Sequence, residues 1–302
     1  MTLHTSPTAF ISRHDELSTL LAYLRQQVPV ALQGPPGCGK TTAVQHCAAT
    51  LGRPLVTVAC SQDLSVHDLV GRFHLRGGET AFLEGPLLRA MRLGALLYLD
   101  EADRAPQDVW SVLHSALDHR RAQHVPELDA LVVAAPGFAV VASYNPVLSS
   151  RTNGLPHAVR QRFVFLTFDY LDEAAEIDLL MRQAGAGVEV ARTLVAIGKA
   201  TREHMRSQHQ PGASTRALLQ AAAVHPGLLG LHEAVETAII ARLTDNPGQR
   251  ETLRSLLEAK GLCSFRDLGA PPQAVPGGAT AAEDSEFHLP VPRLISTTPA
   301  QS

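Results

Sequence analysis

The chain has 302 residues, of which 45% are hydrophobic and 18% are charged, and its formal net charge is -3. This length allows one large domain or two smaller ones with ample core. The slightly acidic balance provides no electrostatic footprint for nucleic acid, so binding to DNA or RNA is not expected. No apolar run approaches the ~18 residues of a transmembrane helix, so insertion into a membrane is not expected either.

Four cysteines, Cys38, Cys47, Cys60 and Cys263, occur without a Cys-x-x-Cys pair and without disulfide-like spacing. This usage is typical of a reducing compartment. The first residues also lack the charged-then-apolar order of a signal peptide. The sequence therefore predicts a cytoplasmic protein.

The first functional motif in chain order is Gly34-Pro35-Pro36-Gly37-Cys38-Gly39-Lys40-Thr41, which matches G-x-x-x-x-G-K-[ST]. An apolar run at 28–33 predicts a buried strand before it, and residues 40–50 predict a helix after it. Backbone N–H groups of such a loop cradle phosphate oxygens, and the helix N-terminus attracts the same anion. The sequence therefore predicts a nucleoside triphosphate site that includes the loop and Thr42.

Magnesium ligands are predicted at two places. The Lys40 side chain would reach the β- and γ-phosphates, while the Thr41 hydroxyl would hold Mg²⁺. A buried strand at 95–99 ends in Asp100 and Glu101. Asp100 would hold the metal, usually through water, and Glu101 would orient and polarise the attacking water.

A further buried strand at 138–143 is followed by Asn145 and Pro146. An asparagine there would lie between the two preceding strands and reach the γ-phosphate or the attacking water. As a lone feature, however, Asn-Pro is simply a turn. The sequence is compatible with both interpretations.

Two arginines follow in a predicted short helix at 155–162, which precedes a strand at 163–168. Arg160 and Arg162 would form either a solvated face or a pair that reaches a phosphate bound in a neighbouring subunit.

After residue 168 the apolar periodicity becomes helical. The segments with this periodicity are 171–184, 188–207, 214–224, 233–243 and 249–259. Ser214 would cap the third of these and place Arg216 in its first turn. A cation there opposes the helix dipole at about 0.3–1 kcal/mol, unless an anion binds nearby. Arg216 is therefore either a structural arginine or an anion-binding one.

Three further segments have weaker signals. Residues 73–82 centre on the turn pair Gly77-Gly78, and residues 125–133 around Asp129 would form a second hairpin. From residue 270 the chain is too rich in Pro, Gly and Ala to assemble a core, so a disordered tail is predicted. Its apolar segment 287–295 would dock on a partner or have no role.

Taken in order, these motifs resemble those of AAA+ ATPases, and more closely the MoxR-like branch that contains the CbbQ, NirQ, NorQ and gas-vesicle GvpN proteins. The resemblance extends from about Ile11 to Phe265. The stretches that carry it, besides the phosphate loop, are 68–73, 77–80, 84–87, 118–121, 143–146, 160–163, 212–216 and 243–247.

The resemblance implies an α/β P-loop core with a parallel sheet at 1–168, an all-α lid at 169–268 and a tail at 269–302. It makes Asn145 the sensor-1 residue, Arg216 the sensor-2 residue and Arg162 or Arg160 the arginine finger. Ile11 resembles the segment that lines the adenine pocket, and the hairpin at 73–82 resembles one near the ring pore.

For function, the resemblance implies a Mg²⁺-dependent ATPase that forms a homo-oligomeric ring, with six subunits as the expected number. Its implied partners are a von Willebrand factor A domain protein and a client protein complex. Related clients include Rubisco, nitric oxide reductase and gas-vesicle proteins, and this sequence does not select among them. A nucleotide-gated assembly scaffold with incidental ATP turnover is the alternative.

Overall fold

The computed structural model describes residues 11, 13, 15–146, 155–225 and 227–265. By contacts the chain splits into Met1–Phe265 and Arg266–Ser302, and only the first of these units contains described residues. The predicted disordered tail and its apolar segment at 287–295 therefore lie outside the described residues.

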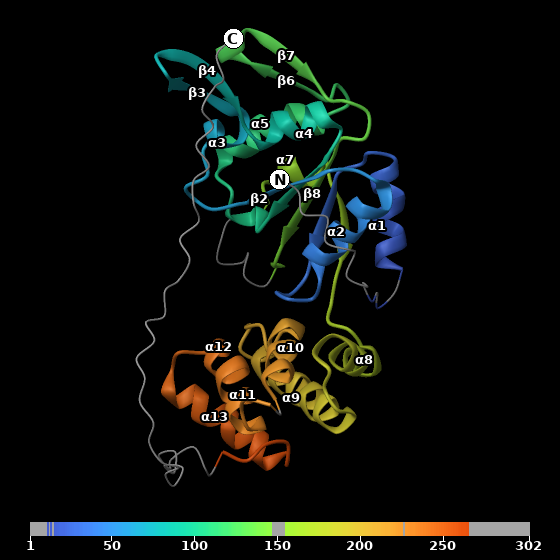
Figure 1. The fold of residues 1–302 in the computed structure, drawn as a ribbon, viewed down its shortest axis with the longest axis vertical. Helices are drawn as coiled ribbons and strands as arrows, with labels where there is room; N and C mark the ends of the chain where they lie inside the picture. The colour runs from blue at the N-terminus through green and yellow to red at the C-terminus, as the bar shows by residue number, and fades with distance from the viewer. Residues whose placement is uncertain (1–10, 12, 14, 147–154, 226, 266–302) are drawn as a thin grey trace, which may run out of the picture. The chain divides into compact units, whose positions relative to one another are not determined.

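A five-stranded parallel sheet forms the centre of residues 15–168, here called the sheet region (Figure 1). Its strands are β1 (Val30–Gln33), β2 (Leu55–Ala59), β5 (Leu96–Asp100), β8 (Ala139–Tyr144) and β9 (Val164–Thr167), in the order β2-β5-β8-β1-β9. The central strand β8 is buried at every position. The α/β class with a parallel sheet is confirmed.

Helices cover both faces of this sheet (Figure 1). They are α1 (Glu16–Arg25) and α2 (Lys40–Leu51) on one face, and α3 (Val66–Val70), α4 (Pro86–Leu93) and α5 (Gln107–Leu117) on the other. Successive side chains of a strand point to opposite faces. Accordingly, Leu96 and Tyr98 of β5 pack with α1 and α2, whereas Leu97 and Leu99 pack with the other helices.

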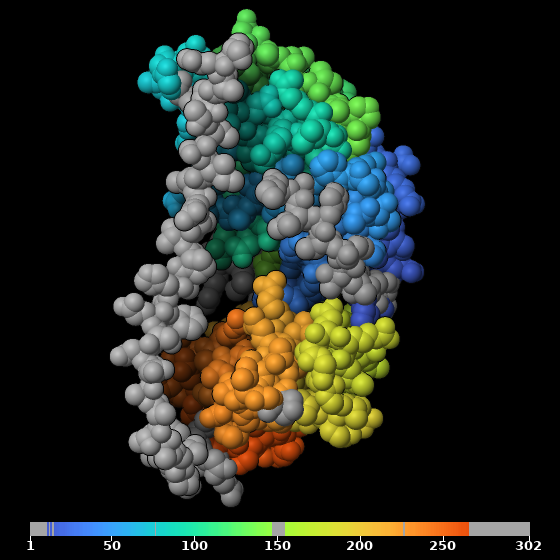
Figure 2. Space-filling view, viewed as in Figure 1, coloured from blue at the N-terminus to red at the C-terminus, as the bar shows by residue number. Residues whose placement is uncertain are grey.

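Two antiparallel hairpins extend from the sheet region and reach the surface (Figure 2). The strands β3 (Gly71–Arg76) and β4 (Glu79–Glu84) are joined by Gly77 and Gly78 at φ of 61° and 90°, so the predicted glycine turn is confirmed. The second hairpin pairs β6 (Ala122–Val125) with β7 (Ala130–Val133). The predicted hairpin at 125–133 begins three residues too late, because the four residues of β7 pair with the four residues 122–125.

Residues 173–265, here called the helical region, pack around a hydrophobic cluster of their own that runs from Leu180 to Phe265. Its helices are α8 (Glu173–Ala184), α9 (Val188–Arg206), α10 (Thr215–Val224), α11 (Leu231–Val235), α12 (Ala241–Leu243) and α13 (Pro247–Ala259). The predicted helix at 233–243 starts earlier and contains a π-helical segment, Glu236–Ile240. None of the helices in the described ranges is long and apolar enough to cross a lipid bilayer.

Candidate nucleotide-binding site

The phosphate loop connects β1 to α2, as the motif requires. Gly37 and Gly39 adopt φ of 70° and 94°, a left-handed conformation that favours glycine. A Cβ added to Gly34 would lie 2.2 Å from the Phe168 carbonyl oxygen, and one added to Gly37 would lie 2.6 Å from Ser214 Cβ. The loop therefore needs glycine both for its turn and for close packing against its neighbours.

The Lys40 ammonium lies inside the curve of this loop. Its Nζ donates hydrogen bonds of 2.8 Å to the carbonyl oxygens of Gly34 and Pro35, and it lies 3.9 Å from Cys38 Sγ. Burial lowers the pKa of Lys40 from its ordinary value, although the nearby Cys38 and Asp100 act in the opposite direction. A half-buried cation held by neutral carbonyls suits a phosphate group.

The two predicted metal ligands are joined by buried hydroxyl groups. The Tyr98 hydroxyl lies 3.1 Å from Thr41 Oγ1, 3.0 Å from Ser143 Oγ and 2.9 Å from Asp100 Oδ1. Ser143 in turn donates a 2.5 Å hydrogen bond to the same Asp100 oxygen. Burial raises the pKa of Tyr98, so its phenol stays neutral and can donate. Such a set of oxygens suits Mg²⁺.

No motif in the sequence identifies Tyr98 or Ser143 as part of the site. The signal for Tyr98 was its position two residues before Asp100, because alternate residues of a strand share a face. Ser143 belongs to β8, the strand that pairs with β5. Only that pairing places its hydroxyl beside the carboxylate.

Glu101 turns away from the strand immediately after Asp100. Its φ of 52° is left-handed, which is unusual for a residue with a side chain and costs about 1–3 kcal/mol. Its N–H donates to Asp100 Oδ1 at 3.1 Å, and its exposed carboxylate pairs with Arg104 at 3.2 Å. The Asp100 carboxylate therefore lies among the buried hydroxyl groups, whereas the Glu101 carboxylate faces solvent.

The strand order decides where Asn145 lies. Strand β8 pairs with β5 on one side and with β1 on the other. Asn145 follows β8, so in strand order it lies between Asp100 and the phosphate loop. Its half-buried amide stands at the carboxyl edge of the sheet, where ligands of open α/β sheets bind.

A cavity of about 220 Å³ joins the phosphate loop to the helical region. The residues that line it are Ile11, Gly37, Cys38, Gly39, Thr42, Gln45, Leu171, Leu179, Gln183, Thr215, Arg216 and Leu219. Ile11, three loop residues, Thr42 and Arg216 are thus brought together. Glu101, Asn145, Arg160 and Arg162 are not among the described residues that line this cavity.

Arg160 and Arg162 are exposed and contact their own segment around α7 (His157–Arg160). Arg162 Nη1 donates to the Ala158 carbonyl at 2.7 Å. The Arg160 guanidinium lies 4.7 Å from the centre of the Phe165 ring. Both cations are therefore placed at the surface, where a second molecule can reach them.

The fold and this loop define a class of protein, the P-loop nucleotide-binding proteins of the AAA type. Residues 29–163 match the family described as AAA domain (dynein-related subfamily), and residues 176–260 match the family described as CbbQ/NirQ/NorQ C-terminal.

Three relatives cover most of the chain. Protein NorQ of Paracoccus denitrificans is 41% identical over 250 residues, which are 83% of this chain and 93% of the relative. Protein CbbQ of Hydrogenophilus thermoluteolus is 37% identical over 80% of this chain and 90% of the relative. Denitrification regulatory protein NirQ of Pseudomonas aeruginosa is 38% identical over 78% and 90%. The chain belongs to the MoxR-like CbbQ/NirQ/NorQ family of AAA+ ATPases.

Proposed function

We propose that this protein is a Mg²⁺-dependent ATPase that forms a homo-oligomeric ring and remodels or activates a client protein, or assists the assembly of a metalloenzyme. The observation that carries the proposal is the shared cavity of the phosphate loop and Arg216. Asp100 at the end of β5, Glu101 just after it and the amide after β8 stand at the same edge of the sheet as this loop.

Each residue of the site has a chemical task in this proposal. Lys40 and the loop N–H groups bind the phosphates, while Thr41 and Asp100 hold the metal. Bound Mg²⁺ would neutralise charge that develops on the phosphate oxygens. Glu101 polarises the attacking water, and Asn145 orients it. Ile11 and the leucines of the cavity provide an apolar place for the adenine base.

The ring is supported by the exposed arginines. A guanidinium stabilises the charge of a phosphoryl-transfer transition state when it reaches the γ-phosphate from a neighbouring subunit. Arg162, or Arg160, is available for this task because both side chains are exposed at the surface. Six subunits are the number we propose.

The proposed target is a protein. The Pseudomonas aeruginosa relative is named a denitrification regulatory protein, and a regulatory role is compatible with action on another protein. A partner with a von Willebrand factor A domain is part of the proposal, since the family resemblance of the motifs implies one. The proposed compartment is the cytoplasm.

The test is the ATPase rate per subunit measured against protein concentration, for the wild type and for Arg162→Ala mixed with Lys40→Ala. A rate that rises with concentration, and a mixture more active than either variant alone, is expected if Arg162 acts in a neighbouring subunit. Arg182→Ala, which removes an exposed arginine paired with Asp178, is the matched control and should keep the wild-type rate. A flat rate with no rescue would exclude the ring.

Glu101→Gln separates an ATPase that performs work from a nucleotide-gated scaffold. The variant should bind ATP as the wild type does and lose turnover, since the amide cannot polarise water as a carboxylate does. In the proposed protein, client activation is lost with turnover. If client activation survived in this variant, the scaffold would be the better description.

A further inference from the structure

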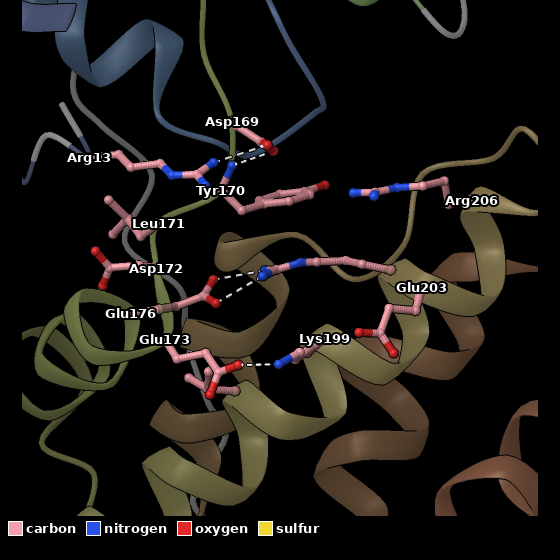
Figure 3. A pocket seen from close by; sticks show the side chains of 12 residues that line it. Arg13, Asp169, Tyr170, Leu171, Asp172, Glu173, Glu176, Lys199, Glu203 and Arg206 are labelled. Carbon is pink, nitrogen blue, oxygen red and sulfur yellow. Dashed lines mark hydrogen bonds and ion pairs between the residues drawn. The ribbon is translucent and has the colours of Figure 1, made fainter. Parts of the chain in front are cut away.

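Four side chains form a polar cluster between the phosphate loop and α10. Tyr170, Glu176, Arg202 and Thr215 are called the Arg202 cluster here, and the first three line a cavity of about 360 Å³ (Figure 3). Arg202 donates two hydrogen bonds to the Glu176 carboxylate, at 2.9 and 2.7 Å. Their side chains are 13% and 1% exposed. Because burying an ion pair has a large desolvation cost, such a pair is weak evidence for stability alone.

The cluster holds the segment that leads into α10. Glu176 accepts a 2.6 Å hydrogen bond from the hydroxyl of Thr215, the first residue of that helix. Arg202 Nε donates to the Ala213 carbonyl at 2.8 Å. A Cβ added to Gly212 would lie 2.4 Å from Arg202 Cα. The start of α10 is therefore fixed against α8 and α9 by side chains and by close backbone packing.

The same cluster also contacts the phosphate loop. The Arg202 guanidinium lies 3.8 Å from the centre of the Tyr170 ring, and the Tyr170 hydroxyl donates to the Pro36 carbonyl at 3.2 Å. Ser214, which caps α10, packs on Gly37 of the same loop. Arg202 thus connects the loop, through one aromatic ring, to the first turn of the helix that contains Arg216.

We propose that the Arg202 cluster positions Arg216 beside the bound phosphates. Tyr170, Glu176, Arg202 and Thr215 are positioning residues in this account, since they act through Arg216. A cation in the first turn opposes the helix dipole, so other contacts must keep it at that place. The inference rests on the proposed function, in which the phosphate loop binds ATP.

A second ion pair in the helical region provides the matched control. Arg254 donates to the Glu236 carboxylate at 2.9 and 2.6 Å, in the same two-bond geometry. It joins α13 to the π-helical segment, and its side chain is 31% exposed. Lysine at either arginine keeps the charge but loses the planar fork.

The experiment compares Arg202→Lys with Arg254→Lys by titrating a fluorescent non-hydrolysable ATP analogue in the presence of Mg²⁺. Arg202→Lys should bind the analogue about five- to tenfold more weakly, a typical size for coupling between two sites. Arg254→Lys should keep the wild-type affinity, although both variants lower the melting temperature. Equal affinity losses in the two variants would overturn the proposal.

A double-mutant cycle distinguishes a positioning role from a merely structural one, because it measures whether the affinity losses of two variants add. If Arg202 acts through Arg216, Arg202→Lys should cause no further loss of affinity in an Arg216→Ala background. Full additivity of the two losses would contradict the positioning role. Thr215→Val removes a single hydroxyl and keeps the test available if Arg202→Lys does not fold. Because Thr215 also lines the nucleotide cavity, this variant is measured in the same Arg216→Ala background, where a positioning role again predicts no further loss. Its control is Thr193→Val, whose hydroxyl bonds the Glu189 carbonyl within α9.

Failure of the proposed function looks different from failure of this inference. If Lys40→Ala bound the analogue as tightly as the wild type, the nucleotide site itself would be wrong. If Lys40→Ala lost binding while Arg202→Lys and Thr215→Val matched their controls, only the positioning role would be excluded.

Discussion

The sheet region and the helical region contribute to the candidate site in different ways. In the sheet region, the residues of the phosphate loop are neighbours in the chain, and so are Asp100 and Glu101. Each of these two sets stands where a strand ends. In the helical region, Arg216 is a single residue whose helix is held by partners far away in sequence. Glu176 is 26 residues from Arg202 and 39 residues from Thr215.

This difference shows that a sequence motif can identify only functional residues that are close together in the chain. Phosphate binding needs several adjacent N–H groups from one loop, so its residues must be neighbours in the chain. Positioning a helix needs side chains from other helices, and nothing requires those to be adjacent. The two glutamates also differ in burial, since the Glu101 side chain is 59% exposed whereas that of Glu176 is 1% exposed.

The largest expected effect is in the sheet region, at Lys40. Lys40→Ala should weaken ATP binding about a hundredfold, because charge-assisted hydrogen bonds to phosphates contribute about 1.5–3 kcal/mol each. Fluorescence titration with a labelled nucleotide measures the loss. Lys260→Ala, at an exposed lysine after α13, should leave the affinity unchanged. Unchanged binding in Lys40→Ala would remove the loop from the site.

The contact between the two regions is tested at Gly37. Gly37→Ala would place a Cβ 2.6 Å from Ser214 Cβ and should weaken ATP binding about thirtyfold, since overpacking costs about 1–3 kcal/mol. Gly52→Ala is the control, because Gly52 has a similar φ of 60° but open space around it. It should lower stability by about 1–2 kcal/mol without affecting binding. Equal binding losses would show that backbone strain, and not the contact with α10, matters.

Within the sheet region, Tyr98 is expected to set the affinity for magnesium. Tyr98→Phe removes the hydroxyl that joins Thr41 to Asp100, and loss of such a supporting group typically weakens metal binding about tenfold or more. When nucleotide binding is measured at increasing Mg²⁺, the variant should need a higher Mg²⁺ concentration than the wild type to reach half of the effect. Its nucleotide affinity in EDTA, without free Mg²⁺, should equal that of the wild type.

Tyr144→Phe is the matched control for this hydroxyl. It also removes a buried phenol hydroxyl from the sheet, one that donates to Gln33 Oε1 at 2.8 Å. Its magnesium midpoint should stay at the wild-type value. A shift of equal size in both variants would indicate a general weakening of the sheet.

The smallest expected effect is on the rate of thiol alkylation. It is measured at Cys38 and at Cys263, which are one half-buried thiol from each region. Burial raises the pKa of both thiols from its ordinary value, so the reactive thiolate is scarce at neutral pH. Alkylation by iodoacetamide should therefore accelerate about tenfold between pH 7 and pH 8. ATP with Mg²⁺ should slow labelling of Cys38, which lines the cavity, and not of Cys263. Mass spectrometry reads both sites, and equal protection would argue against local shielding.

The sequence contains the pattern of one helix that was not predicted. Helix α5 has buried residues at Val109, Leu113 and Leu117, the spacing of a helix face, although no element is predicted there. The β6–β7 hairpin shows the opposite case. Its first strand has few apolar residues, so its start depends on the partner strand and not on a local pattern.

By itself, the sequence determined the phosphate loop, the carboxylates at the end of β5, the glycine turn of the first hairpin and the first-turn position of Arg216. Each of these depends on residues that are close in the chain. Tertiary structure alone decided the strand order that places Asn145 beside the loop, the hydroxyl network around Tyr98 and the Arg202 cluster. The physical reason is that these contacts join residues distant in sequence, and only packing of the sheet and helices brings such residues together.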